Sequence, residues 1–268
     1  MSPTASYTRN ILLTGYWPPT NEMLRHFSTK PTANPDGWQG RDWQSTGFDV
    51  YAFFPEFEPG CEIKVSSGDS CWVGSGDLRV DYAATTRDFR RITATIRPCA
   101  IITFSRGGSG ASWEIEGACR NLARWRPDAS RSGQPDPSPP DPTFPEDFPR
   151  SSTLPMEKIE RRVKAAGLDL RVFIDRHGGT GAFLSEFIGY LGTWHQSRHA
   201  SSASSSMCVA AGHIHVGIDT DLAVAVQATE ITLDTLIAHV RDLLPSEAPP
   251  PTAVRPQWLE PVLAVLED

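Results

Sequence analysis

The sequence predicts an α/β protein with a largely parallel β-sheet, and two observations carry this prediction. Short apolar segments of strand length alternate along the 268 residues with segments whose apolar residues recur at helical spacing. In addition, residues 170–191 pass from an apolar strand through a glycine-rich turn into a helix, the kind of connection that parallel sheets use. The chain shows no internal repeat, and we expect one α/β domain over residues 1–268.

Two apolar periodicities place the individual elements. Continuous or alternating apolar runs predict strands at 10–14, 48–53, 99–104, 170–174 and 207–216. Apolar residues three and four positions apart predict helices at 81–96, 156–166, 183–191, 232–244 and 258–266. Pro98 and Gly167 follow two of these helices, as helix-ending residues commonly do.

Two segments interrupt this alternation and are predicted to be insertions. Residues 126–150 contain eight prolines, so they form an extended loop without a core of its own. Loops of that length are usually functional or disordered. Residues 196–206 contain six serines and are expected to form a surface insertion.

Composition and charge exclude several classes of protein. The formal net charge of -7 argues against a general nucleic-acid binder, and no apolar run approaches the roughly 18–20 residues of a membrane helix. The first ten residues are polar and lack the apolar region of a signal peptide. The five cysteines are odd in number and lack paired metal-ligand spacing, so we expect a reduced, cytoplasmic protein.

The glycine-rich turn before the helix at 183–191 is the first candidate site. Gly178, Gly179, Gly181 and Ala182 have almost no side chain, and Ser185 falls in the first turn of the following helix. Unpaired N–H groups and the positive end of the helix dipole gather at such a position, which often holds a nucleophile or an anion. The alternative is that Ser185 is a capping or solvent-facing residue of an ordinary αβ unit.

Two further loops follow predicted strands. Tyr16 and Trp17 come after the strand at 10–14, and Arg106, Gly107 and Gly108 come after the strand at 99–104. Ligands of open α/β sheets bind at the carboxyl ends of the strands, so both loops are candidates for substrate binding. Plain loop packing is the alternative for both.

Five segments in this chain order resemble the pyroglutamyl peptidase I family of cysteine peptidases. They are Leu12-Leu-Thr-Gly15, Ile115-Glu116 with Asn121, Ser152-Thr-Leu-Pro155, Phe183-Leu-Ser-Glu-Phe187 and Ala211-Gly-His-Ile-His-Val216. The resemblance covers most of residues 10–245. It implies a three-layer α/β/α fold with a mostly parallel twisted sheet, a homo-oligomer, and a small-molecule or peptide substrate. It also implies that Ser185 takes the nucleophile position, His215 the histidine position and Glu116 the acidic position.

Several positions depart from the family pattern. Serine replaces the nucleophilic cysteine, so a base must remove the hydroxyl proton during attack. The family's arginine after the glutamate is Gly117, and its Phe-Glu-Pro-Phe loop is Tyr16-Trp-Pro-Pro19. Arg106 occupies a position near the family's neutral lactam, and a buried arginine favours a carboxylate or a phosphate. Pyroglutamyl peptidase activity itself is therefore not expected.

Three functions are compatible with these residues. The first is a cofactor-free hydrolase for a small, acidic amide or ester, using Ser185, His215 and Glu116, with an oxyanion hole from Gly107 and Gly108 or from the 178–185 turn. The second is a non-catalytic binding protein that has lost the catalytic cysteine. The third is a metal-dependent hydrolase, because His213 and His215 project from the same face of a strand and His177 lies near a strand end.

Overall fold

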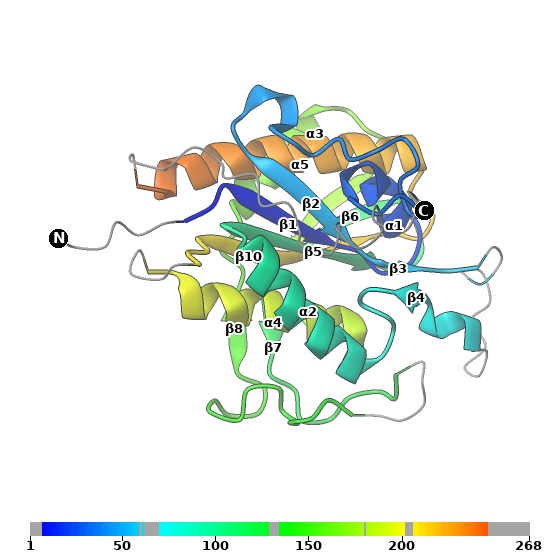
Figure 1. Ribbon diagram of the computed structural model, residues 1–268, viewed down its shortest axis with the longest axis vertical. Coiled ribbons are helices and arrows are strands. Elements are labelled where there is room, and N and C mark those ends of the chain that lie inside the picture. Colours follow the sequence, from blue (N-terminus) through cyan, green and yellow to red (C-terminus); the bar gives the residue numbers. More distant parts are fainter. Residues whose placement is uncertain are drawn as a thin grey trace, which may run out of the picture.

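A six-stranded sheet forms the centre of the protein in the computed structural model, which describes residues 7–58, 61, 70–128, 134–179, 181–201 and 206–245. Its strand order is β2-β1-β5-β10-β6-β9. The bounds are β1 Asn10–Thr14, β2 Asp49–Phe53, β5 Ala100–Arg106, β6 Ser112–Glu116, β9 Arg171–Asp175 and β10 Ala210–Val216. Helices cover both faces (Figure 1).

Four of the five neighbouring strand pairs in this sheet are parallel. The exception is the β10–β6 pair, which is antiparallel, so β6 and β9 run against the other four strands. The predicted α/β class with a mostly parallel sheet is confirmed, and the sequence did not predict β6.

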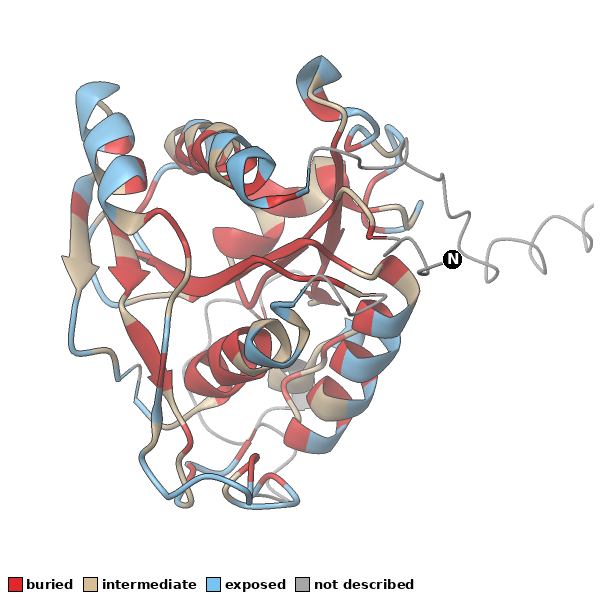
Figure 2. Cartoon of the chain, turned by 90° about the vertical axis from the view of Figure 1, so that its left-hand side faces the viewer, coloured by how far each residue is buried: buried red, intermediate tan, exposed pale blue. Residues whose placement is uncertain are grey.

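The side chains on the two faces of the sheet pack into two separate apolar clusters. Helices α1 (Thr20–Leu24), α3 (Met156–Ala165) and α5 (Leu222–Leu243) pack on one face, and α2 (Tyr82–Ile96) and α4 (Leu184–His199) pack on the other. Figure 2 shows the buried sheet between helices whose outer surfaces are exposed. Alternation of side chains along each strand divides the core in this way, since successive residues face opposite layers.

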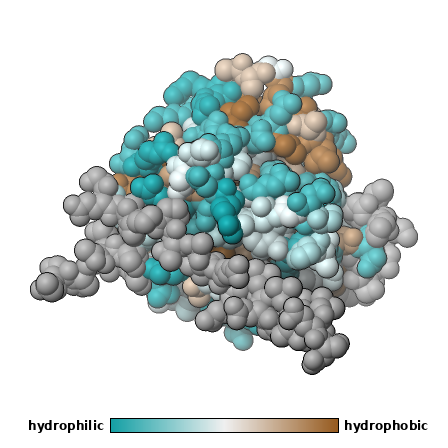
Figure 3. Space-filling view, turned by 45° about the horizontal axis from the view of Figure 1, so that its top comes forward, coloured by the Kyte–Doolittle hydropathy of each residue, from teal (hydrophilic) through white to brown (hydrophobic). Residues whose placement is uncertain are grey.

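Shorter elements connect these layers. They are the strand pairs β3 (Pro55–Glu56) with β4 (Ser75–Gly76) and β7 (Ala118–Arg120) with β8 (Pro149–Ser151), and the 3₁₀ helices Arg25–Phe27, Trp43–Ser45 and Ser70–Val73. None of the helices in the described ranges is long and apolar enough to span a membrane. The face in Figure 3 is mainly hydrophilic, with hydrophobic side chains gathered in one smaller area.

Two helices differ from their predicted bounds. Helix α5 begins at Leu222, ten residues before the predicted start at Thr232, because Asp221 caps it by accepting from the N–H groups of Ala223 and Val224. Helix α4 continues to His199, so the first part of the predicted serine-rich insertion at 196–206 is helical. Residues 202–205 of that insertion, and the predicted helix at 258–266, lie outside the described residues.

The described part of the proline-rich loop is anchored at two buried points. The side-chain amide of Asn121 donates to the carbonyl oxygens of Asp141, Phe144 and Pro145. Arg150 forms an ion pair with Asp141 at 2.6 Å and also donates to the hydroxyl of Tyr190 on α4. Residues 134–150 are therefore an ordered excursion that packs on α4.

Candidate active site

Polar residues on three adjacent strands share the sheet face that α4 covers. The β10–β6 register places His215 opposite Glu114 and His213 opposite Glu116, and the β6–β9 register places Glu116 opposite Asp175. Side chains of directly paired residues point to the same face of a sheet. Three carboxylates and two imidazoles therefore converge on one patch of the sheet.

Helix α4 lies close to this patch because Gly189 has no side chain. A Cβ atom on Gly189 would come within 3.2 Å of Cβ of His213. Ser185 lies four residues earlier on the same side of the helix, and His215 lies two residues later on the same side of the strand. Helix and strand run in opposite directions, so this packing brings Ser185 toward His215.

The turn before α4 needs residues without bulky side chains. Gly178 has a φ of +63°, and a Cβ there would lie 2.1 Å from the carbonyl oxygen of Ala118. Gly181 and Ala182 also have positive φ values, of 92° and 55°. Because the turn is this tight, α4 starts at Leu184, and Ser185 takes the first-turn position that the sequence predicts.

A cavity of about 380 Å³ opens above the patch. Trp17, Trp72, Arg106, Gly107, Gly108, Glu114, Glu116, Arg126, Asp175, Gly179, Gly181, Phe183, Ser185 and His215 line it. The structure thus brings together the three candidate catalytic residues and all of the candidate substrate-binding residues except Tyr16. No residue of the described loop segment 134–150 lines the cavity.

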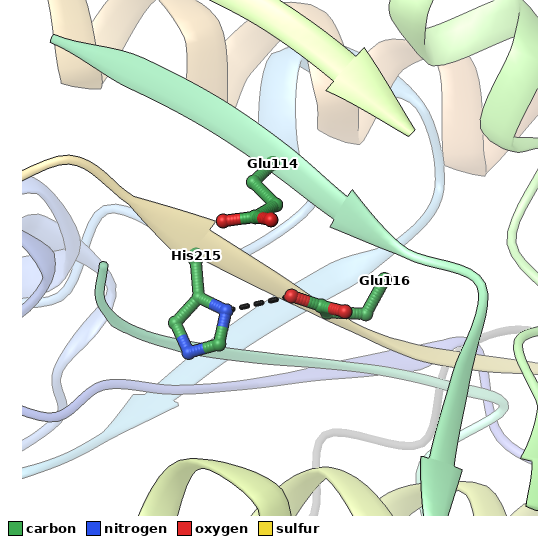
Figure 4. A group of neighbouring side chains, drawn as sticks. All are labelled: Glu114, Glu116 and His215. Carbon is green, nitrogen blue, oxygen red and sulfur yellow. Dashed lines mark hydrogen bonds and ion pairs between the residues drawn. The ribbon is translucent and has the colours of Figure 1, made fainter. Parts of the chain in front are cut away.

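A buried hydrogen bond joins two of the candidate catalytic residues. Nδ1 of His215 lies 2.8 Å from Oε1 of Glu116, and the two side chains are only 8% and 2% exposed. Figure 4 shows Glu114 and Glu116 beside the imidazole of His215. The second oxygen of Glu116, Oε2, is buried and has no hydrogen-bond partner in the described part of the chain.

Burial favours the neutral forms of both partners. It raises the pKa of Glu116 to about 8, with further contributions from the negative charges of Asp175 and Glu186. Burial also lowers the pKa of His215, although the carboxylates of Glu114, Glu186 and Asp175 oppose this change. The two shifts favour a protonated Glu116 beside a neutral His215, and they place the titration of Glu116 within the pH range that acid–base catalysis uses.

His213 has a different role from His215. Its Nδ1 lies 2.8 Å from Oγ1 of Thr103, its Nε2 lies 3.0 Å from Oγ of Ser105, and the side chain is fully buried. Its ring meets that of His215 edge-on, with 4.6 Å between the centroids. Both of its ring nitrogens have hydrogen-bond partners, and His213 is not among the residues that line the cavity. His213 therefore packs against His215 and does not face a substrate.

Two other candidates lie away from the cavity. His177 is exposed, and among the described contacts its backbone N–H donates to Asp175 while its carbonyl accepts from Arg120. Tyr16 is fully buried, and its hydroxyl lies 2.6 Å from Oγ1 of Thr85. Tyr16 packs against Trp17 and so fixes the aromatic wall without lining the cavity.

Another part of the cavity lining combines aromatic and cationic groups. Trp17 stacks on Phe183 with 6.0 Å between ring centroids, and the guanidinium of Arg106 lies over the Trp17 ring at 5.7 Å. Arg126 also lines the cavity, and its backbone N–H donates to the carbonyl of Ala182. Sequence analysis missed Arg126 as a substrate-binding candidate, because it is the first residue of the predicted proline-rich loop and belongs to no recognisable motif.

Glu114 was also missed, although the sequence contained a signal for it. Glu114 and Glu116 are two residues apart in a strand and therefore face the same side. Ligand atoms of Glu114, Glu116 and His215 all lie within 4.8 Å of one another, and they form the group of possible metal ligands in the described residues. This set contains neither His213 nor His177, the partners that the sequence suggested.

One predicted oxyanion donor is already engaged. The N–H of Gly107 donates to the carbonyl of Val216 at 2.7 Å, which holds the loop against β10. The first N–H groups of α4 have no carbonyl partner within the helix and lie beside Ser185. The helix terminus is therefore a better candidate than Gly107 for binding a negative oxygen.

Comparison with known proteins identifies the fold. No protein-family model matches the chain, and no curated protein matches it. Pyrrolidone carboxyl peptidase from Pyrococcus furiosus has a similar structure, with a TM-score of 0.58 and 16% identity over 86% of this chain and 99% of that one. The enzyme from Thermococcus litoralis gives 0.59 and 15% over 90% and 99%.

Pyroglutamyl peptidase I from Bacillus amyloliquefaciens is similar to the same degree, with a TM-score of 0.57 and 16% identity over 86% of this chain and 98% of its own. The chain therefore has the fold of the pyrrolidone carboxyl peptidases, and the family resemblance seen in the sequence is confirmed at the level of the fold.

Proposed function

We propose that the protein is a serine hydrolase that cleaves a small, acidic amide or ester with Ser185, His215 and Glu116. The observation that carries this proposal is the buried 2.8 Å hydrogen bond between His215 and Glu116, at the edge of a cavity that Ser185 also lines. The shared fold supports it, because the similar structures are peptidases by name.

Once Glu116 is ionised, above its pKa of about 8, the hydrogen bond gives His215 the tautomer that a general base needs. When the carboxylate of Glu116 accepts the proton on Nδ1, the lone pair of the neutral ring is on Nε2. Nε2 would remove the proton from Ser185 as Oγ attacks the substrate carbonyl, and would then donate that proton to the leaving group. Ser185 and His215 line the same cavity without a hydrogen bond between them among the described residues, and such contacts often shorten only when substrate binds.

The first turn of α4 would stabilise the tetrahedral intermediate. Its N–H groups and the positive end of the helix dipole lie beside the attacking oxygen. Gly108 could add a donor from the opposite loop, since its N–H is not among the backbone hydrogen bonds of the described residues. Losing one such donor typically costs about 2.7–4 kcal/mol of transition-state stabilisation.

Arg106 and Arg126 would select the substrate. Both line the cavity, and guanidinium groups recognise carboxylates through paired hydrogen bonds. Trp17 and Phe183 offer a flat apolar wall next to them. We therefore propose a substrate with a carboxylate a few atoms from the scissile carbonyl. We also propose a cytoplasmic protein, from the number and spacing of its cysteines, and a homo-oligomer, from the family resemblance.

Labelling with a fluorophosphonate probe tests the proposal, because such probes react with activated serines. The wild-type protein should be labelled and Ser185→Ala should not. Ser151→Ala, which alters an exposed serine on β8, should be labelled like the wild type. A folded wild-type protein that resists the probe would overturn the proposal and leave the binding-protein and metal-hydrolase alternatives. Equal labelling of Ser185→Ala would also overturn it, because the probe would then react with another residue.

A further inference from the structure

We propose that Glu114, Glu116 and His215 form a binding site for a divalent transition-metal ion, for which zinc is the test ion, and that the bound ion blocks His215 from acting as a base. The binding half of this proposal stands on the geometry of the three residues alone. The inhibitory half rests on the proposed serine hydrolase function.

The three side chains present a mixed carboxylate and imidazole donor set on a rigid support. Glu114 lies directly opposite His215 in the β6–β10 ladder, and one ligand atom from each of the three residues lies within 4.8 Å of the others. Donors around a single zinc ion are about 3.4 Å apart, given bonds of about 2.0–2.2 Å in tetrahedral geometry. Metal binding would require the glutamate side chains to rotate and close this difference.

A second observation points to a cation at this position. Oε2 of Glu116 is buried, and no group in the described part of the chain donates a hydrogen bond to it. Glu116 is only 2% exposed, and Oε2 itself has almost no exposed surface although other atoms of the residue line the cavity. A buried carboxylate oxygen without a partner is costly, and a metal ion bound by the carboxylate would compensate it.

The charges around the three ligands also favour a cation. Asp175 lies beside Glu116 in the β6–β9 register, and the buried Glu186 lies near enough to affect the charge state of Glu116. Arg106 and Arg126 line the same cavity. The positive charges of these two side chains would repel a bound cation. An anionic group of the substrate, bound by each guanidinium, would reduce this repulsion.

Metal binding and base catalysis exclude each other at this imidazole. A metal bound through Nδ1 replaces the hydrogen bond from Nδ1 to Glu116, and the neutral ring then carries its proton on Nε2. Nε2 then has no lone pair to accept the proton of Ser185. The ion would therefore compete with the hydrogen bond on which the proposed mechanism depends. His215 could bind the metal or act as the general base, but could not do both at once.

Isothermal titration calorimetry with zinc chloride tests the binding half. Wild-type protein should bind about one ion per chain, Glu114→Gln and His215→Gln should each bind at least tenfold more weakly, and Glu157→Gln, an exposed site on α3, should bind like the wild type. Two ligand variants are used so that a folding defect in one does not remove the test. An absence of zinc binding by the wild type, or equal binding by Glu114→Gln, would overturn the proposal.

Labelling of Ser185 with and without zinc tests the inhibitory half. Zinc should slow the labelling of the wild type at least tenfold, and should change the rate of Glu114→Gln by less than twofold relative to the same variant without zinc. Faster labelling with zinc would instead indicate an ion that activates Ser185, and faster hydrolysis without faster labelling would indicate an ion that activates water; either result would overturn this half. If the wild type is never labelled, the hydrolase proposal fails while calorimetry still decides the metal site.

Discussion

Gly189 of helix α4 lies so close to His213 of strand β10 that a single added carbon would crowd the imidazole and collide with Sγ of Cys119. A Cβ atom at Gly189 would lie 3.2 Å from Cβ of His213 and 2.6 Å from Sγ of Cys119. This contact sets the height of α4 above the sheet and so the distance between Ser185 and His215. The candidate nucleophile and base therefore depend on a residue that touches neither substrate nor cavity.

Replacing Gly189 with alanine should move α4 away from the sheet. We expect Gly189→Ala to lower the rate of fluorophosphonate labelling at least tenfold and to reduce the melting temperature. Gly192→Ala is the matched control, because its Cβ would make only ordinary contacts of 3.4 Å and 3.6 Å and alanine favours helix. Equal labelling rates for the two variants would show that the height of α4 does not control the site.

The activity of Ser185 should rise with pH through about 8. Burial, with the nearby charges of Asp175 and Glu186, raises the pKa of Glu116 to about 8. Below that pH the Glu116–His215 pair holds two protons and Nε2 is blocked, whereas above it Nε2 is free to accept one. Labelling rates measured from pH 6 to pH 9.5 should increase, with circular dichroism confirming the fold throughout. A flat or falling profile would contradict this assignment.

Glu116→Gln should lower the rate of fluorophosphonate labelling and abolish its rise with pH. At high pH the same variant should be more stable than the wild type. A glutamine amide that donates to Nδ1 leaves the proton of the ring on Nε2, so labelling should fall by about 10³–10⁴-fold. Folding raises the pKa of Glu116, so the folded wild-type protein must bury a charged carboxylate once the pH exceeds about 8. The contribution of Glu116 to the free energy of unfolding is therefore lost as the pH rises through about 8. We therefore expect the variant to melt above the wild type at pH 9, by roughly 2–4 °C for each kcal/mol of relieved burial cost. A variant that melts lower at pH 9 would refute this account.

Arg106 should determine the preference for acidic ligands. If its guanidinium binds the substrate carboxylate, glutarate should protect wild-type Ser185 from labelling better than the neutral glutaramide. Arg106→Gln should reduce protection by glutarate at least tenfold and leave that by glutaramide unchanged. Arg124→Gln, an exposed site outside the cavity lining, should behave as the wild type. Equal loss for both compounds would point to a packing role for Arg106 against Trp17.

Arg150 should stabilise the fold without controlling the chemistry. Removing it leaves Asp141, which is 1% exposed, without its ion-pair partner, a change that typically costs about 3–5 kcal/mol. Arg150→Met should therefore lower the melting temperature by roughly 6–20 °C. Lys164→Met, at an exposed ion pair with Glu160, should change it by less than about 2 °C. At 10 °C the labelling rate of Arg150→Met should stay within threefold of the wild type, since residues 134–150 do not line the cavity.

The sequence by itself determined the fold class and the position of the candidate nucleophile. Strand and helix periodicities lie within single segments, so they are visible without a structure. Gly178, Gly179 and Gly181 likewise reflect a local backbone requirement, since all three have positive φ. Ser185, His215 and Glu116 were named from the order of short motifs, and the structure brings them to one cavity.

Only the tertiary structure decided which groups surround His215. The pairing of His215 with Glu114, and of Glu116 with Asp175, joins strands far apart in the chain. Register between such strands is set by packing across the sheet, and no local pattern encodes it. The same long-range packing gives both nitrogens of His213 a partner on β5, brings Arg126 into the cavity, and engages the N–H of Gly107. Residue types and local turns are properties of the sequence, whereas distances between side chains come from how its segments pack.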